Sequence, residues 1–249
     1  MDNCETLLKI TAKNIEIGFS ETLFTCESIV LEAGKCYSLI GKNGSGKSTF
    51  MQTLLGHIPL RNGQLFLDNR PIETIKPVEQ AKLIAFVASK FDGVQHLSVR
   101  EYITLGRAPY TNFLGKTTQK DTEKVQEIIE LLSIQKLADK DTTEISDGER
   151  QIVSIARALA QETPIILLDE PTAFLDYANR LHVLKILRKI AHEQKTCIIQ
   201  SSHDLELCMT YSDALLLVNP IAKKLEEIAP SDKQAILKIA FPELPEGEN

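Results

Sequence analysis

Five short runs of apolar residues are spaced along the chain. They are CYSLI at 36–40, LIAFVA at 83–88, IILL at 165–168, CII at 197–199 and ALLLV at 214–218. Runs that are apolar on both faces are typical of strands in a parallel sheet buried between helices. Two further segments, 6–35 and 62–72, alternate between apolar and polar residues and predict short strands, with the Asn62-Gly63 pair as a turn signal.

Helical periodicity fills the intervals between these runs. Apolar residues repeat at i, i+3, i+4 and i+7 from Val125 to Leu132 and from Ile152 to Leu159, and a further helix is expected from Phe50 to Leu55. Strands that alternate with helices indicate an α/β fold with right-handed crossovers. The segment from about 90 to 155 shows helices and turns but no convincing strand, which predicts a helical lobe inserted into the sheet domain.

The bulk composition limits the class of protein. The 249 residues are enough for one large domain, or for a domain with an inserted lobe. The net charge of −6 argues against a dedicated nucleic-acid binder, which usually carries a basic face. Five cysteines without a CxxC pair fit a reducing compartment. The first residues lack a signal-peptide pattern and no apolar stretch approaches the roughly 18–20 residues of a membrane span, so any membrane role is expected to come through partners.

A glycine-rich loop follows the first apolar run. The segment GKNGSGKS at 41–48 matches the pattern G-x-x-x-x-G-K-[ST], and it stands between an expected strand and an expected helix. The glycines let backbone N–H groups turn towards phosphate oxygens, and the helix adds its positive N-terminal end. Lys47 can reach the β- and γ-phosphates, and Ser48 offers a hydroxyl to Mg²⁺. The glycine spacing disfavours a dinucleotide-binding fold.

Two carboxylates follow the IILL run directly. Asp169 and Glu170 therefore stand at the carboxyl end of a buried strand, where open α/β sheets bind their ligands. Asp169 is expected to hold Mg²⁺, mostly through water, and Glu170 to polarise the attacking water as a general base. The alternative is a strand that ends in two solvated acids.

Two more segments carry candidate chemistry. Ser146 and Glu149 have the S-x-x-E spacing of a capping box, which predicts a helix start. Beyond that structural role, this helix N-terminus, with Ser146 and Gly148, is a candidate second binder of a γ-phosphate. His203 follows the CII run and is expected to reach the edge of the γ-phosphate, although a lone histidine is often structural.

In this order, the four segments resemble the ATP-binding cassette (ABC) ATPases over nearly the whole chain. Gly41–Thr49 is similar to the Walker A motif, and Ile165–Glu170 to the Walker B motif with its catalytic glutamate. Ile145–Glu149 is similar to the signature motif, Ala173–Asp176 to the D-loop, and His203 to the switch histidine. The resemblance implies a P-loop NTPase core with a parallel sheet, an N-terminal antiparallel β subdomain and an inserted helical subdomain.

The resemblance also implies a set of site residues. The residues expected to bind the nucleotide are Phe19, Gly41, Asn43, Gly44, Ser45, Gly46, Lys47, Ser48, Thr49, Ser146, Gly148 and Glu149. The residues expected to take part in catalysis are Lys47, Glu170 and His203, and those expected to hold Mg²⁺ are Ser48, Asp169 and Ser89. Phe19 stands where family members place an aromatic ring against adenine, and core packing is its alternative role.

Two positions depart from the family pattern. Ser89 stands near the end of the 83–88 strand, where relatives carry the Q-loop glutamine, and Gln95 lies six residues later. The shorter reach of Ser89 towards Mg²⁺ is expected to weaken coupling to a partner more than ATP binding. Asp147 stands where the signature usually has glycine, and an acid there would repel a γ-phosphate unless its side chain points away.

The implied architecture is one nucleotide-binding domain over 1–249. The core and β subdomain are expected at 1–88 and 156–249, and the helical subdomain at 89–155. In the family, two such subunits pack head to tail around two ATP molecules. ATP binding closes the dimer, hydrolysis reopens it, and this motion drives a membrane partner.

The stretch LSVREYITLGRAPY at 97–110 resembles cassettes of importers for ferric siderophores, haem and cobalamin, with a generic amphipathic helix as the alternative. Leu97, Val99, Tyr102 and Ile103 are then expected to help form the groove for a short membrane-domain helix. The first hypothesis is the ATPase subunit of such an importer at the cytoplasmic face of the inner (plasma) membrane. Its expected partners are integral-membrane permease subunits, a second copy of the chain and, indirectly, a substrate-binding protein, without nucleic acid.

Two other functions stay open at this point. A cassette of a soluble assembly, such as an iron–sulfur scaffold, would bind no membrane protein. A nucleotide-gated binding module would close on ATP but hydrolyse it poorly, given Ser89 and Asp147, and Glu170 and His203 argue against it.

Overall fold

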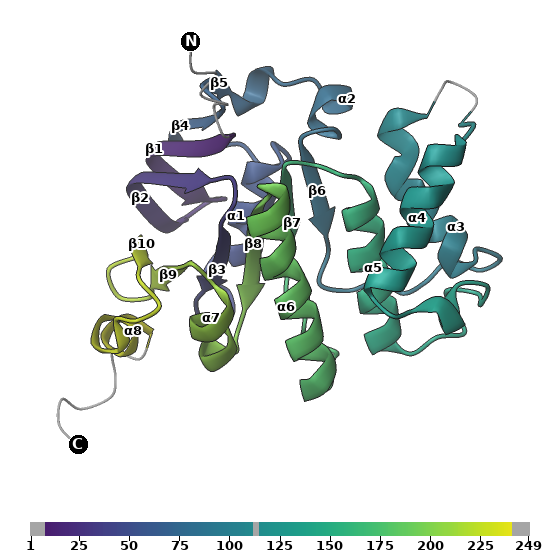
Figure 1. Ribbon diagram of the computed structural model, residues 1–249. Helices are drawn as coiled ribbons and strands as arrows, with labels where there is room; N and C mark the ends of the chain where they lie inside the picture. Colours follow the sequence, from purple (N-terminus) through teal and green to yellow (C-terminus); the bar gives the residue numbers. More distant parts are fainter. Residues whose placement is uncertain (1–7, 112–114, 241–249) are drawn as a thin grey trace, which may run out of the picture.

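The computed structural model describes residues 8–111 and 115–240, and within them ten strands hydrogen-bond into one sheet (Figure 1). The strand order is β5-β4-β1-β2-β10-β9-β3-β8-β7-β6. The strands are β1 (Lys9–Gly18), β2 (Thr22–Glu32), β3 (Cys36–Ile40), β4 (Asn62–Leu67), β5 (Arg70–Pro71), β6 (Ile84–Val87), β7 (Ile165–Leu168), β8 (Cys197–Ser202), β9 (Ala214–Asn219) and β10 (Lys224–Ile228). The helices are α1 (Lys47–Leu54), α2 (Pro77–Gln80), α3 (Val99–Thr104), α4 (Gln119–Leu131), α5 (Asp147–Ala160), α6 (Tyr177–Gln194), α7 (Leu205–Tyr211) and α8 (Lys233–Ala240), with 3₁₀ turns η1 (Ile72–Thr74), η2 (Leu105–Tyr110) and η3 (Gln135–Leu137).

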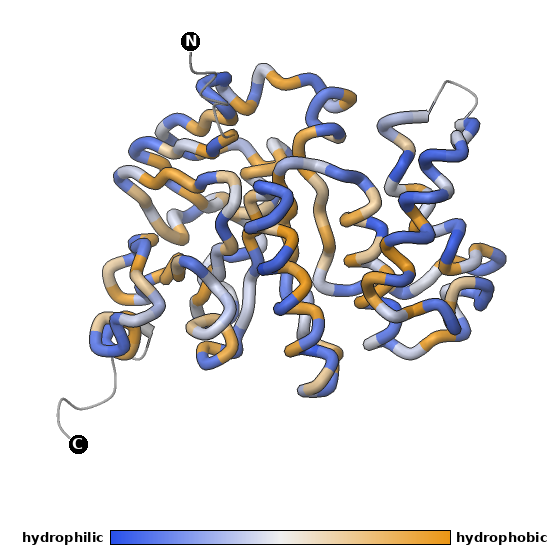
Figure 2. Tube along the Cα trace, in the orientation of Figure 1, coloured by the Kyte–Doolittle hydropathy of each residue, from blue (hydrophilic) through white to orange (hydrophobic). Residues whose placement is uncertain are grey.

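The five apolar runs form the parallel half of the sheet. Strands β9, β3, β8, β7 and β6 are neighbours in that order, and each adjacent pair runs parallel. Both faces of these strands are covered. In β7, Ile166 and Leu168 pack with residues of α5 and α6, whereas Ile165 and Leu167 pack with residues of α1, β1 and β2. Figure 2 shows the hydrophobic positions concentrated along these central strands. The prediction of a buried parallel sheet is confirmed.

The antiparallel half lies at the N-terminal side. Strands β2, β1, β4 and β5 pair antiparallel, which confirms the predicted N-terminal β subdomain. The predicted turn at Asn62-Gly63 is wrong, since both residues lie in β4, where the pairing with β1 shifts register. A Cβ atom on Gly63 would lie 2.2 Å from the carbonyl oxygen of Asn14, so glycine is required there by close backbone approach. A two-residue turn lies instead at the far end of β4, where Asp68 and Asn69, both with positive φ, join it to β5.

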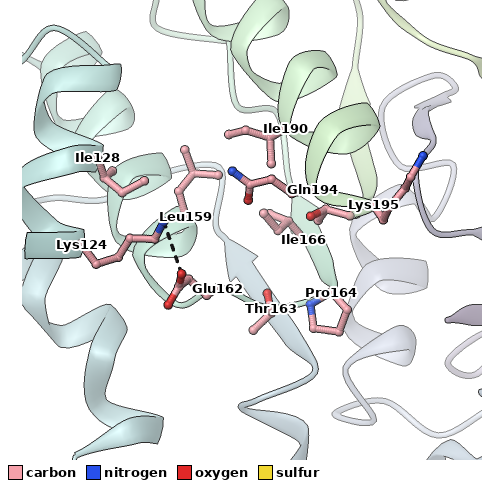
Figure 3. A pocket seen from close by; sticks show the side chains of 11 residues that line it. Lys124, Ile128, Leu159, Glu162, Thr163, Pro164, Ile166, Ile190, Gln194 and Lys195 are labelled. Carbon is pink, nitrogen blue, oxygen red and sulfur yellow. Dashed lines mark ion pairs between the residues drawn. The ribbon is translucent and has the colours of Figure 1, made fainter. Parts of the chain in front are cut away.

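A group of helices, with α3, η2 and α4, lies beyond β6 at one end of the sheet (Figure 1). The buried guanidinium group of Arg107 helps to attach this group of helices to the sheet. Arg107 donates from Nε to Asp121 at 2.8 Å, and from Nη1 to the carbonyl oxygen of Ala160 at 2.7 Å and to Glu162 at 2.6 Å. Lys124 of α4 also pairs with Glu162, at one side of a cleft whose other side is lined by α6 (Figure 3). Because Glu162 follows α5 and precedes β7, these contacts join the helical lobe to the edge of the sheet where β7 begins.

Two further features concern the environment of the chain. None of the helices in the described ranges 8–111 and 115–240 has the length and hydrophobicity needed to cross a membrane.

Cys26, Cys36, Cys197 and Cys208 are buried free thiols, and burial raises the pKa of each. Their thiols are therefore kept protonated and unreactive at neutral pH. Cys4 lies outside the described residues.

Candidate functional site

The glycine-rich loop joins β3 to α1 at the carboxyl edge of the parallel strands. Gly44 and Gly46 have φ values of 77° and 103°, a left-handed conformation that glycine adopts without steric cost. A Cβ atom on Gly46 would lie 3.1 Å from side-chain atoms of Leu23 and Phe24, so the loop also passes close to β2. Helix α1 begins directly after Gly46 and has no side-chain cap. Its first backbone N–H groups are thereby directed towards the loop, as an anion site requires.

Lys47 is buried beneath the loop. Its Nζ donates to the carbonyl oxygens of Gly41 at 2.8 Å and Lys42 at 3.3 Å. Burial lowers the pKa of Lys47, and the charges of Glu170 and Asp169 oppose that change. The ammonium group is thus fixed in position and placed near the two predicted carboxylates.

Asp169 lies at the carboxyl end of β7 and is buried. Its Oδ2 accepts a hydrogen bond from Ser48 Oγ at 2.7 Å, and its Oδ1 accepts one from Ser201 Oγ at 2.7 Å. The structure therefore brings together the hydroxyl of α1 and the carboxylate of β7, which the sequence predicted as Mg²⁺ ligands. Ser201 was not among the predicted residues, because it stands in a polar extension of the CII run.

Glu170 and His203 meet beside this pair. Glu170 Oε1 and His203 Nε2 lie 2.6 Å apart, and both side chains are partly exposed. Glu170 has a φ of 49°, which is unusual for a residue with a side chain, and its N–H donates to Ser201 Oγ at 2.8 Å. The alternative of two solvated acids at the strand end is wrong, because both acids have fixed partners.

The Ser146 segment forms a second group at the start of α5. Ser146 Oγ and N–H both donate to Glu149 Oε2 at 2.8 Å, so the predicted capping box is confirmed. These bonds lower the pKa of Glu149. The carboxylate of Asp147 pairs with Arg150 one turn along α5. The acid at the position of the usual signature glycine is therefore held by a cation of its own helix.

The residues around the loop suit a nucleotide and a divalent cation. Ser45 Oγ is buried and has no hydrogen-bond partner among the described residues, which leaves a polar atom inside the loop for a phosphate. A Cβ atom on Gly41 would lie 2.5 Å from that hydroxyl and would displace it. Ser48 and Asp169 supply hard oxygen donors of the kind that Mg²⁺ prefers. Asn43 lies in the loop, and Thr49 lies in the first turn of α1.

Comparison with known proteins identifies the family. The family described as "ABC transporter" matches residues 27–173. The chain belongs to this family. It is therefore a cassette that binds nucleotide and hydrolyses ATP.

Several ABC proteins are similar over most of the chain. The achromobactin transport ATP-binding protein CbrD of Dickeya dadantii is 33% identical over 84% of this chain and 78% of its own length. The petrobactin import ATP-binding protein FpuC of Bacillus anthracis is 35% identical over 77% of this chain and 70% of its own length. The dimeric structure of MJ0796, an ABC transporter cassette, superposes with a TM-score of 0.78 at 21% identity, covering 89% of this chain and 98% of that one. The predicted P-loop fold is confirmed.

The remaining predicted residues of the ABC site lie at its margins. Phe19 is 65% exposed, so the alternative that its ring packs in the core is wrong. Ser89 lies two residues beyond β6, whose Val87 carbonyl accepts a hydrogen bond from Asp169 N at 2.9 Å. Gly148 lies against the backbone of Phe174 in the D-loop segment, where a Cβ atom would be 2.9 Å from the carbonyl oxygen. The roles of Phe19, Ser89 and Gly148 towards nucleotide or Mg²⁺ stay predictions.

One expectation for the helical lobe is partly wrong. Val99 and Ile103 are fully buried in the core of the lobe and cannot line a surface groove. Their i, i+4 spacing marks the inner face of α3. Tyr102 is partly buried and stacks on Phe91 with ring centroids 4.2 Å apart, and Leu97 is half-buried. Only these last two retain surface that a partner helix could contact.

Proposed function

We propose that this ABC ATPase powers an importer of metal chelates, with a ferric siderophore, haem or cobalamin as cargo. The observation that carries the proposal is similarity over most of the chain to two ATP-binding proteins named for achromobactin transport and petrobactin import. The stretch at 97–110, which resembles cassettes of this importer subclass, supports the same assignment. The cargo would be selected by the membrane subunits and a binding protein, because a cassette does not contact it.

In this proposal, Glu170 is the general base of hydrolysis. Its carboxylate stands at the end of β7 and is oriented by His203 Nε2, 2.6 Å away. A base held in this way can take the proton of an attacking water as the bond to the γ-phosphate forms. The ammonium group of Lys47 and the N-terminal N–H groups of α1 stabilise negative charge on the phosphates.

Ser48 and Asp169 are the proposed holders of Mg²⁺, with Ser89 as a further contact through water. When bound, the ion neutralises charge that develops on the phosphate oxygens. The hydrogen bond from Ser48 to Asp169 sets the hydroxyl oxygen and the carboxylate oxygen 2.7 Å apart, so both oxygens can face one small cation. Ser201 fixes the other oxygen of the carboxylate.

A second copy of the chain is the proposed dimer partner. The start of α5, with Ser146 and Gly148, lies at the same edge of the sheet as the phosphate loop, because α5 runs antiparallel to the strand β7 that follows it. Head-to-tail pairing would bring this helix N-terminus to the phosphate loop of the other copy. The dimeric structure of the cassette MJ0796, which shares this fold, supports the pairing of two copies.

Purification from the native cell tests the importer assignment. We expect the tagged chain, extracted with a mild detergent, to co-purify with a polytopic permease at the cytoplasmic face of the membrane. The complex should bind a ferric siderophore, haem or cobalamin through its binding protein. Recovery with soluble partners alone would reject the importer and favour the soluble-assembly alternative.

The permease complex also allows a test of Ser89. Substitution of Ser89→Gln gives the longer side chain of the family pattern at this position, two residues beyond β6. We expect permease-stimulated ATP turnover to rise several-fold, with the affinity for ATP changed less than about twofold, since a glutamine amide reaches about two bonds farther than a hydroxyl. Unchanged stimulation would show that the missing glutamine does not limit coupling. Gln95→Ala, in the exposed loop six residues later, is the control and should change neither quantity.

A further inference from the structure

Ser201 is a buried residue that joins the two acidic residues of the site. It lies in β8 and has no solvent exposure. Its hydroxyl donates to Asp169 Oδ1 at 2.7 Å and accepts from the Glu170 N–H at 2.8 Å. A serine hydroxyl has one proton to donate and can accept at the same time, so both bonds are satisfied together.

The Glu170 backbone needs such a partner. Its φ of 49° places a residue with a large side chain in the left-handed region, a strained conformation that the surrounding structure must hold. The N–H bond to Ser201 fixes this turn from the neighbouring strand. The carboxylate at the other end of Glu170 is fixed by His203, two residues after Ser201. The end of β8 thus holds Glu170 at both its backbone and its side chain.

The position of Ser201 follows from the sheet register. Leu168 of β7 pairs with Gln200 of β8, so the next residues, Asp169 and Ser201, are neighbours at the carboxyl edge. On its other side, β8 pairs with β3, where Ser201 is opposite Leu39, shortly before the phosphate loop. Ser201 therefore stands on the central strand between the phosphate loop and the acids, where an apolar residue would fit the sheet as well.

We propose that Ser201 is a positioning residue for ATP hydrolysis, which aims the Asp169 carboxylate and holds the Glu170 turn. The proposal rests on the roles proposed above for Asp169 and Glu170. Without this hydroxyl, Asp169 keeps only the Ser48 bond and the Glu170 N–H is left unpaired. Both acids then lose the fixed geometry on which proton transfer and cation binding depend.

Substitution of Ser201→Ala tests this role. The test measures kcat and the Mg²⁺ dependence of nucleotide binding, which would not change if the hydroxyl only stabilised the fold. We expect kcat to fall about tenfold while KM for ATP changes less than about twofold. We also expect the Mg²⁺ concentration for half-maximal binding of a fluorescent ATP analogue to rise several-fold, which is measured without turnover. Ser201→Thr keeps the hydroxyl and should restore both quantities to within about threefold. If the alanine variant does not fold, Ser201→Cys, with its weak S–H donor, takes its place.

Ser38→Ala is the matched control. Ser38 is equally buried, lies on the adjacent strand β3 and bonds to Ser212 at 2.6 Å and to Gln200 at 3.1 Å, without contact to the acids. It should lower the unfolding temperature but leave kcat and the Mg²⁺ dependence unchanged. If Ser201→Ala behaves like Ser38→Ala, the positioning role is rejected. A wild-type chain without Mg²⁺-dependent hydrolysis would instead reject the proposed roles of Asp169 and Glu170, so the two failures are distinguishable.

Discussion

Substitution of Glu170→Gln is expected to lower the steady rate of ATP hydrolysis by at least about 100-fold, because general-base catalysis typically contributes 10²–10⁴-fold. The amide has nearly the shape of the carboxylate but cannot accept a proton from water. The hydrogen-bond partners of Glu170, His203 at the side chain and Ser201 at the backbone, lie outside the substituted group. ATP binding is therefore expected to change less than about threefold. Phosphate release gives the rate, and titration with a fluorescent ATP analogue gives the affinity.

A second glutamate provides a matched control for this experiment. Glu162 also has a left-handed backbone, with φ of 49°, and its carboxylate is likewise held by a partner, Arg107. It lies where β7 begins, whereas Glu170 lies beyond the end of that strand. Glu162→Gln is expected to lower stability and leave the hydrolysis rate unchanged. A Glu170→Gln variant that hydrolyses ATP within about threefold of the wild-type rate would show that Glu170 is not the base. A wild-type rate no higher than the background rate without protein would instead favour the poorly hydrolysing module.

The strands that support this site could be predicted because burial on both faces leaves a simple pattern. Strands β3 and β7 coincide with the runs CYSLI and IILL, and the acids after IILL lie at the strand end as expected. The end of β8 could not be predicted in the same way. Residues 200–202 are polar but buried; Gln200 donates to Ser38 on β3, and Ser201 donates to Asp169 at the end of β7. A hydropathy pattern ends where such residues begin, so Ser201 could be recognised only from its neighbours in space.

In the helical lobe, the sequence predicts an apolar helix face but not the surface that covers it. The spacing of Val99 and Ile103 correctly marks an apolar face of α3, but periodicity does not say which surface covers that face. In the structure the cover is the core of the lobe itself. The partner of Asp147 does have a local signal in the sequence, since Arg150 stands three residues later, at the spacing of a helical ion pair. Because Arg150 holds the Asp147 carboxylate, this acid in the signature segment need not repel a γ-phosphate.

Substitution of Lys47→Ala is expected to weaken ATP binding by about 100-fold or more. The ammonium group is preorganised by the carbonyl oxygens of Gly41 and Lys42, and hydrogen bonds to charged groups contribute about 1.5–3 kcal/mol each. Two such bonds to phosphate oxygens correspond to roughly 10²–10⁴ in affinity. The substitution also leaves the charges of Asp169 and Glu170 without the nearby cation that opposes them. Equilibrium titration with ATP gives the loss directly.

Adenosine separates this electrostatic effect from a distorted loop. It lacks phosphates, so wild type and Lys47→Ala should bind it with the same weak affinity if the substitution removes only the phosphate contact. Lys124→Ala is the control for loss of a half-buried lysine, because Lys124 pairs with Glu127 and Glu162 at 3.0 and 3.3 Å in the helical lobe, on the side where β7 begins (Figure 3). It should leave both affinities unchanged. Equal losses for ATP and adenosine in Lys47→Ala would mean that the lysine supports the fold of the loop. An unchanged ATP affinity would remove Lys47 from the nucleotide site, and with it the argument that the buried cation offsets the phosphate charge.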